Sequence, residues 1–266
     1  MANIRSLLLV FLVTFAIAPR VEAGEFVHFK SGNATLIGYL ARPMGSGPFP
    51  AVVLLHGSGG FHASMLSWAD RLSRWGYVAL SVDSFSPRGR RGAGNVANEQ
   101  AGDAFEALRY LTGLSQVRAN AVALMGFSMG GMSTLADLEQ GSSIARLYRD
   151  RFRAGIAFYP QCDGFSGLMS VPTLVLVGEL DSWTTAAACI DMVAGKSVIG
   201  LERTPGIRPD VKLIIYPGAR HGFDIADLGI IMGGVTVEGH RLEYNEAATR
   251  DAAQQVRSFL DSKLVD

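Results

Sequence analysis

Strand-length apolar runs alternate with segments of helical periodicity along this 266-residue chain from residue 50 onwards. Residues 50–56 (PAVVLLH) form a continuous run that is typical of a strand buried on both faces. In residues 65–75, apolar side chains return every three or four positions, as on the buried side of a helix. The other predicted strands cover residues 25–30, 34–41, 77–82, 121–127, 155–159, 171–177 and 211–216, and the other predicted helices cover 101–111, 129–140, 184–194 and 246–262. This alternation predicts an α/β fold, with a mostly parallel sheet covered by helices on both faces.

Length and composition limit the number of domains and the kind of partner. The chain is 48% hydrophobic and 18% charged, a composition that suits a protein with a large hydrophobic core. Its 266 residues are enough for one large domain but few for two. Because no internal repeat or linker-like stretch interrupts it, we predict a single domain over residues 24–266. Two long connections, residues 84–98 and 225–243, are expected to border a site. Lys and Arg total 24, as do Asp and Glu, so no basic excess favours a nucleic-acid partner.

Residues 1–23 are typical of a signal peptide. Arg5 supplies a positive start, residues 7–18 are apolar apart from Thr14, and residues 21–23 (VEA) offer a small-residue cleavage site. The twelve-residue apolar run spans roughly 18 Å as a helix, well short of a hydrocarbon core of about 30 Å, so we expect no stable membrane anchor. A buried N-terminal helix is the alternative, but the run has no polar face. We therefore predict export to the periplasm or the medium.

Export changes the expectation for the two cysteines, Cys162 and Cys189. In an oxidising compartment they are expected to form a disulfide across 27 residues, worth about 3.5 kcal/mol in the chain-entropy model. The alternative is a pair of buried thiols that never meet, because sequence does not show how far apart their Cα atoms lie. Neither cysteine has the spacing of a metal-ligand motif, so no metal site is predicted.

Residues 126–130 (GFSMG) carry the strongest chemical signal of the chain. A GxSxG pattern alone is weak, but here it follows the apolar run 121–125 directly and precedes a helical pattern. That is the context of a nucleophile elbow, in which a serine stands on a sharp turn between a strand and a helix. We therefore predict Ser128 as a nucleophile; a glycine-rich turn that merely caps a helix is the alternative.

An activated serine needs a base, and His221 has the required place. It follows the last predicted strand, at the edge of a parallel sheet where ligands gather. Its position after Ser128 also fits the chain order nucleophile, acid, histidine of this kind of fold. The other four histidines lack one or both of these features: His28, His56, His62 and His240.

The third catalytic group is expected to hold the histidine ring in one tautomer and to stabilise its charge. Asp181 follows the predicted strand 171–177 and lies between Ser128 and His221 in the chain. Glu179, closer to the strand, and Asp163, one strand earlier, remain alternatives.

Backbone N–H groups are expected to bind the oxyanion. One belongs to Met129, which follows the nucleophile, and the other to the glycine-rich loop 56–60, where Ser58 is preferred over Gly59. His56 in this loop is predicted to be structural rather than catalytic.

Six short runs, in order along the chain, carry a family resemblance: LHGSGG at 55–60, VDSFSPRG at 82–89, GFSMGG at 126–131, FYP at 158–160, GELD at 178–181 and YPGARHGFD at 216–224. Together they resemble the dienelactone hydrolase family of the α/β-hydrolase superfamily. The resemblance implies an eight-stranded, mainly parallel sheet and a triad of Ser128, Asp181 and His221. Dienelactone hydrolases proper carry a cysteine nucleophile, so Ser128 favours a broader serine esterase.

Substrate contacts are predicted from residues near the expected site. Arg88 follows a strand end and is expected to pair with a substrate carboxylate, as an arginine does in lactonases of the family; a solvated loop is the alternative. Trp183 and Phe223 flank the catalytic positions and indicate an apolar pocket, with ordinary packing as the alternative.

The predicted function is that of an exported serine hydrolase that cleaves small carboxylic esters or lactones without metal or organic cofactor. A secreted polyester hydrolase or peptidase would share the triad, whereas a non-catalytic binding protein would need a broken one. The sequence says nothing about oligomeric state.

Overall fold

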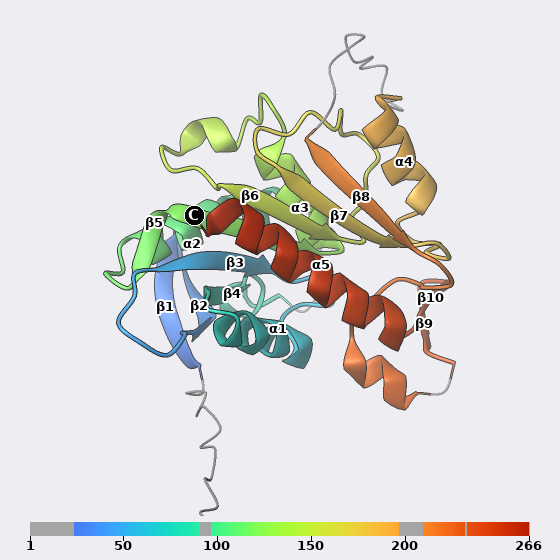
Figure 1. Ribbon diagram of the computed structural model, residues 1–266, viewed down its shortest axis with the longest axis horizontal. Coiled ribbons are helices and arrows are strands. Elements are labelled where there is room, and N and C mark those ends of the chain that lie inside the picture. The colour runs from blue at the N-terminus through green and yellow to red at the C-terminus, as the bar shows by residue number, and fades with distance from the viewer. Residues whose placement is uncertain (1–23, 91–96, 197–209, 232, 266) are drawn as a thin grey trace, which may run out of the picture.

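Strands and helices alternate along the chain as predicted (Figure 1). The computed structural model describes residues 24–90, 97–196, 210–231 and 233–265. Its strands are β1 (Glu25–Ser31), β2 (Ala34–Ala41), β3 (Phe49–Leu55), β4 (Val78–Asp83), β5 (Val117–Phe127), β6 (Ala154–Phe158), β7 (Thr173–Gly178), β8 (Val211–Tyr216), β9 (Val235–Val237) and β10 (His240–Leu242). Its helices are α1 (Ala63–Arg74), α2 (Ala97–Thr112), α3 (Met129–Leu138), α4 (Ala186–Ala194) and α5 (Glu246–Leu264), with short 3-10 turns at Ser86–Arg88, Ala145–Leu147 and Ala226–Ile230.

Eight of the strands form one sheet in the order β1-β2-β4-β3-β5-β6-β7-β8. β1 pairs antiparallel with β2, and β2 pairs antiparallel with β4, while the strands from β4 to β8 in this order are all parallel. Every residue of β4, β6 and β7 is buried, as expected for strands that are covered on both faces. The predicted fold class is therefore confirmed. The carboxyl ends of the parallel strands meet at one edge of the sheet.

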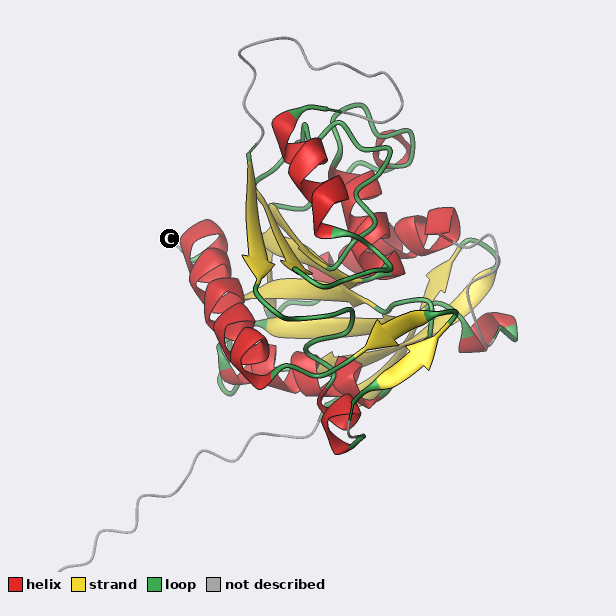
Figure 2. Ribbon diagram, turned by 90° about the vertical axis from the view of Figure 1, so that its right-hand side faces the viewer, coloured by secondary structure: helices red, strands yellow, loops and turns green. Residues whose placement is uncertain are grey.

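Helices cover both faces of the twisted sheet (Figure 2). One core cluster joins α1 and α5 to one face, and a second joins α2, α3 and α4 to the other. β3 shows how one strand serves both clusters, because Val52 and Leu54 belong to the first and Val53 and Leu55 to the second. This alternation is the two-residue period of a strand with two apolar environments.

The structure corrects two details of the predicted elements. β5 begins at Val117, and its early residues Ala119 and Asn120 are exposed, so an apolar run could not reveal them. Residues 225–243, predicted as a plain connection, contain the turn Ala226–Ile230 and an antiparallel hairpin of β9 and β10. Strands of three residues carry too little periodicity to be recognised from sequence.

The described chain begins at Gly24, which is tied to the rest of the molecule. Its backbone N–H donates to Tyr39 Oη at 2.9 Å, and the Tyr39 hydroxyl donates to Asp70 Oδ1 of α1, also at 2.9 Å. The predicted signal peptide, residues 1–23, lies outside the described residues. Among the described residues, no helix combines the length and apolarity needed to cross a bilayer.

Candidate active site

Ser128 stands on a sharp turn between β5 and α3. Its φ of 53° lies in the left-handed region, which residues other than glycine rarely adopt, so the backbone of the turn is strained. Two glycines make the turn possible. A Cβ at Gly126 would lie 2.0 Å from the Gly130 carbonyl oxygen, and a Cβ at Gly130 would lie 2.4 Å from the Leu55 carbonyl oxygen. The strand and helix pack too closely for any larger residue, which explains the GxSxG spacing in physical terms.

The structure brings Ser128, His221 and Asp181 together from three separate loops. His221 Nε2 lies 2.9 Å from Ser128 Oγ, and His221 Nδ1 lies 2.7 Å from Asp181 Oδ2. Asp181 follows β7 and His221 follows β8, so both come from the carboxyl edge of the sheet. Both side chains are buried, which shields their interactions from water.

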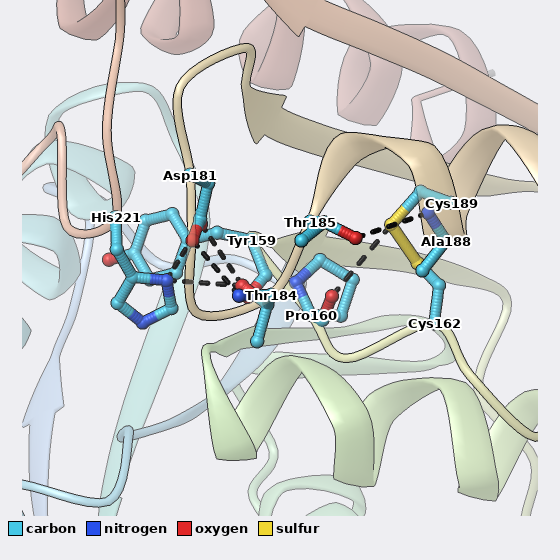
Figure 3. Close-up of a disulfide and its surroundings, with 9 residues drawn as sticks. All are labelled: Tyr159, Pro160, Cys162, Asp181, Thr184, Thr185, Ala188, Cys189 and His221. Atoms are coloured by element: carbon cyan, nitrogen blue, oxygen red, sulfur yellow. Dashed lines mark hydrogen bonds and ion pairs between the residues drawn. A yellow bond between two sulfur atoms is a disulfide. The ribbon is translucent and has the colours of Figure 1, made fainter. Parts of the chain in front are cut away.

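Asp181 is held by more than the histidine (Figure 3). Its Oδ1 accepts hydrogen bonds from the backbone N–H groups of Trp183 and Thr184, both at 2.9 Å. The Thr184 hydroxyl lies 3.0 Å from Asp181 Oδ2 and 3.1 Å from His221 Nδ1. Burial by itself raises the pKa of Asp181, but the hydrogen bond and charge of His221, together with the two backbone donors, outweigh it and leave this pKa below its ordinary value. Asp181 is therefore the ionised partner of the imidazole at neutral pH.

The alternative acids lie elsewhere. Glu179 accepts a hydrogen bond from the backbone N–H of Gly218 at 2.9 Å and is exposed, and Asp163 is exposed as well.

Of the other histidines, His56 is fully buried beneath the site loop. Its Nε2 accepts from the backbone N–H of Ser84 at 3.2 Å, so its Nδ1 carries the proton and donates to the Gly57 carbonyl at 2.7 Å. Burial lowers its pKa and keeps the ring neutral. His28 is exposed on β1, and His62 contacts Ser64.

The two residues predicted to donate to the oxyanion follow the nucleophile or belong to a loop beside it. Met129 is the first residue of α3, where backbone N–H groups point out of the helix and the helix dipole is positive. In the loop after β3, a Cβ at Gly57 would lie 3.2 Å from Ser128 Cβ, so this loop passes close to the serine. In the described part of the chain, the N–H groups of Met129 and Ser58 have no hydrogen-bond acceptor.

Two predicted substrate contacts need correction. Arg88 donates two hydrogen bonds to the fully buried carboxylate of Asp103, both at 2.8 Å, and a third to the Ser84 carbonyl. Its guanidinium is thus committed to an internal ion pair rather than to a substrate carboxylate. Phe223 has 0% exposed surface and packs against Phe158 and other core rings, so it cannot line a pocket.

Trp183 does lie at the site, between two histidines. The centre of its indole ring is 5.3 Å from the ring centre of His221 and 5.3 Å from that of His240, on which it stacks at 17°. His240 is the first residue of β10, so the hairpin unrecognised in the sequence lies beside Trp183 at the site. The end of this hairpin contacts His221 directly, because Leu242 forms a bridge with His221 and the N–H of the next residue, Glu243, donates to the His221 carbonyl at 3.3 Å.

A buried hydrogen-bond network behind His221 was not predicted. The carboxylate of Asp224 accepts from Trp68 Nε1 on α1 and from the Tyr159 hydroxyl, both at 2.7 Å. The Tyr159 ring lies 4.6 Å from that of His221, and its carbonyl accepts from the Thr184 hydroxyl. Burial raises the pKa of Asp224, and the two donors offset part of that rise. Asp224 lies within the run YPGARHGFD, but its partners come from distant segments that no local pattern connects to it.

Cys162 and Cys189 are joined by a disulfide, with their Cα atoms 4.9 Å apart (Figure 3). The bond links the loop after β6 to α4, which begins shortly after Asp181 and Thr184.

Comparison with known proteins identifies the family. The model of the dienelactone hydrolase family matches residues 36–264. The chain belongs to the dienelactone hydrolase family. As a member, it is a carboxylic ester hydrolase with the α/β-hydrolase fold.

Relatives and solved structures agree with this membership. A Bradyrhizobium protein named as a probable 2-oxo-3-(5-oxofuran-2-ylidene)propanoate lactonase is 27% identical over 77% of this chain and 86% of its own. A Synechocystis protein with a provisional carboxymethylenebutenolidase name is 26% identical over 90% of this chain and 96% of its own. Among solved structures, the Thermogutta terrifontis esterase crystallised with propionate superposes with a TM-score of 0.66 at 16% identity, covering 93% of this chain and 98% of that one. This dienelactone hydrolase family member therefore shares its fold with esterases of very different sequence.

Proposed function

We propose that this dienelactone hydrolase family member cleaves small carboxylic esters or lactones through Ser128, His221 and Asp181, with an acyl-enzyme intermediate. The observation that carries the proposal is the continuous hydrogen-bonded chain from Ser128 Oγ through both His221 nitrogens to Asp181, with contacts of 2.9 and 2.7 Å. A serine in such a chain is activated because the histidine takes its proton while the carboxylate stabilises the resulting imidazolium.

The reaction follows from these positions. Ser128 Oγ attacks the carbonyl carbon while His221 Nε2 accepts its proton, and the Met129 and Ser58 N–H groups donate to the oxyanion. The tetrahedral intermediate collapses, the C–O bond to the leaving alcohol breaks, and His221 protonates that alcohol. A water molecule then loses a proton to His221, attacks the acyl-enzyme and releases the acid with Ser128 restored. A lactone follows the same steps, with the alcohol still attached to the acid.

Three observations bear on the substrate. Because Arg88 is paired with Asp103, we assign this arginine no part in recognising a substrate carboxylate. The lactonase name of the Bradyrhizobium relative supports lactones among the substrates. The aromatic surface of Trp183 and His240 beside the imidazole supports an apolar acyl or alcohol group.

We further propose that residues 24–266 are one domain that is exported after loss of residues 1–23. The disulfide supports an oxidising compartment, because cytosolic thiols are normally kept reduced. N-terminal sequencing of the natural protein should begin at Gly24; a chain that begins at residue 1 would contradict export by cleavage.

The decisive experiment is hydrolysis of p-nitrophenyl acetate, butyrate and a lactone by the wild type and by Ser128→Ala. The variant should lose up to ~10⁶-fold in kcat, since the nucleophile is gone while the fold remains. Labelling by a fluorophosphonate should mark Ser128 in the wild type and be absent in the variant.

Ser73→Ala provides a control, because Ser73 is a buried serine on α1 whose hydroxyl donates to the Asp70 carbonyl, away from Ser128. It should keep both labelling and turnover. Turnover of polymeric polyester or peptide but of no small ester would favour the alternative hydrolases, and absence of labelling would favour a binding protein.

A further inference from the structure

A groove lies between α1 and α5 on one face of the molecule, with a volume of about 540 Å³. Four arginines line it: Arg71 and Arg74 from α1, and Arg250 and Arg257 from α5. Trp75 and Tyr244 add aromatic surface. These six residues are called the arginine groove below. None of them contacts Ser128, His221 or Asp181 in the described structure, so the groove is separate from the site proposed for ester cleavage.

The positive charge of the arginine groove is largely uncompensated. Within the described residues, three of its arginines have no carboxylate within 4.0 Å, and Arg257 reaches only Asp261, with Nε 3.8 Å from Oδ2 on the exposed side of α5. Glu246 is the one carboxylate among the described lining residues. Arg88, by contrast, is paired closely with Asp103 at 2.8 Å. Four guanidinium groups facing one carboxylate repel one another unless an anion joins them.

Two of the guanidinium groups are held in place by stacking. Arg71 Cζ lies 4.9 Å from the centre of the Trp68 ring, and Arg257 Cζ lies 5.9 Å from that of Trp75. The two indoles pack edge to face, with ring centres 6.4 Å apart. A guanidinium stacked on a ring keeps its N–H edge available for bidentate hydrogen bonds, and its fixed position lowers the entropy lost on binding.

The pKa of Arg71 reflects the repulsion between neighbouring arginines. Burial and the nearby charge of Arg74 lower the pKa of Arg71 below its ordinary value, although Asp224 and Tyr244 act in the opposite direction. A bound anion would relieve this repulsion.

We propose that the arginine groove binds a phosphate group that carries two or more negative charges. A tetrahedral phosphate has enough acceptor oxygens for the planar N–H forks of two or more arginines, which a single carboxylate lacks. The aromatic surfaces of Trp75 and Tyr244 fit an apolar part of the same ligand. The phosphate belongs either to a free phosphate compound or to a lipid headgroup, and these two sources can be separated by experiment.

The test measures binding of inorganic pyrophosphate by calorimetry, and binding to phosphatidylcholine vesicles with and without phosphatidic acid by sedimentation. The exposed arginines of the groove are removed in Arg74→Gln/Arg250→Gln. The control is Arg146→Gln/Arg149→Gln, which removes the same charge from two exposed arginines that do not line the groove. The groove variant should bind at least about tenfold more weakly, because it loses two charge-assisted contacts, while the control stays close to wild type.

Arg71→Lys separates geometry from charge. It keeps the positive charge but loses the planar fork, so pyrophosphate affinity should fall several-fold if bidentate contacts matter. Its melting temperature serves as the check that α1 remains packed.

Pyrophosphate binding alone identifies a free phosphate compound, binding to phosphatidic acid vesicles alone identifies a lipid headgroup, and either supports the proposal if the groove variant loses it. The proposal is overturned if wild-type protein binds neither probe, or if both double variants lose binding equally, because the interaction is then non-specific charge attraction.

Discussion

Single residues at the candidate site are fixed by several partners each. Asp181 accepts from two backbone N–H groups besides its contact with His221, and Thr184 links it to the Tyr159 carbonyl. Such redundancy keeps the imidazole in one tautomer and one orientation, which general-base chemistry requires.

The stability of the folded protein should depend on pH through Asp181. Because the pKa of Asp181 is lower in the folded than in the unfolded state, its carboxylate stabilises the fold above the unfolded pKa of about 3.9, and this stabilisation is lost as pH falls through the folded value. Asp181→Asn should therefore be less stable than wild type by roughly 1.5–3 kcal/mol at neutral pH. Urea unfolding at a series of pH values should show the difference shrinking below about pH 4. A difference independent of pH would contradict this.

Asp224 touches neither Ser128 nor a reacting atom, and its hydrogen-bond partners are Trp68 and Tyr159. Asp224→Ala should lower kcat by about 10²-fold with little change in KM, because Tyr159 and the loop of His221 lose their common anchor. Asp224→Asn keeps an acceptor and should recover part of the loss. Asp261→Ala is the control, since the exposed Asp261 accepts a hydrogen bond from the Tyr77 hydroxyl away from the site. Equal kcat losses in Asp224→Ala and Asp261→Ala would mean that only general stability is affected.

At the scale of elements, the elbow depends on how closely β5, α3 and the end of β3 approach one another. Gly130 is the second residue of α3, and alanine is normally a better helix former than glycine. Its position against the Leu55 carbonyl reverses that preference.

Gly130→Ala should accordingly destabilise the protein by about 1–3 kcal/mol through overpacking, and should also displace Ser128 and reduce turnover. The control is Gly102→Ala in α2, where a Cβ meets only the Tyr148 hydroxyl at 3.4 Å. That change should be neutral or stabilising. Chemical unfolding of both variants measures the contrast, and a stable Gly130→Ala would show that β3 can move away.

Elements also show how far sequence alone can go. Strands such as β4 and β7 were predictable because every residue in them is buried. Ser128, Asp181 and His221 could be singled out because each follows a strand of the parallel sheet, β5, β7 and β8 respectively. The ion pair of Arg88 with Asp103 could not be foreseen, because a strand-end arginine reveals nothing of Asp103, which only the packing of α2 brings to it. The hairpin that carries His240 was missed because strands of three residues leave no period.

At the scale of the whole molecule, most cross-links are weak interactions, but one is covalent. The disulfide ties the β6 loop to α4 and closes 27 residues around the segment that carries Asp181 and Thr184. It therefore stabilises the fold and the candidate site together.

Cys162→Ala/Cys189→Ala should lower the unfolding free energy by about 3 kcal/mol, which corresponds to roughly 6–12 °C in Tm for a chain of this size. Calorimetry measures the shift, and wild-type protein alkylated without reductant should gain no mass. Addition of two alkyl groups would refute the disulfide.

The hydrogen bond from Gly24 to Tyr39 would change in strength if the mature chain begins at Gly24. Proteolysis would turn its amide into an α-ammonium group, which would then face a phenol already bonded to Asp70. A neutral contact becomes a charge-assisted one, and such contacts are roughly twice as strong. The precursor and the processed enzyme would then differ in the strength of the contact that links the start of β1 to α1 through Tyr39. Cleavage during export would in that case stabilise this edge of the sheet.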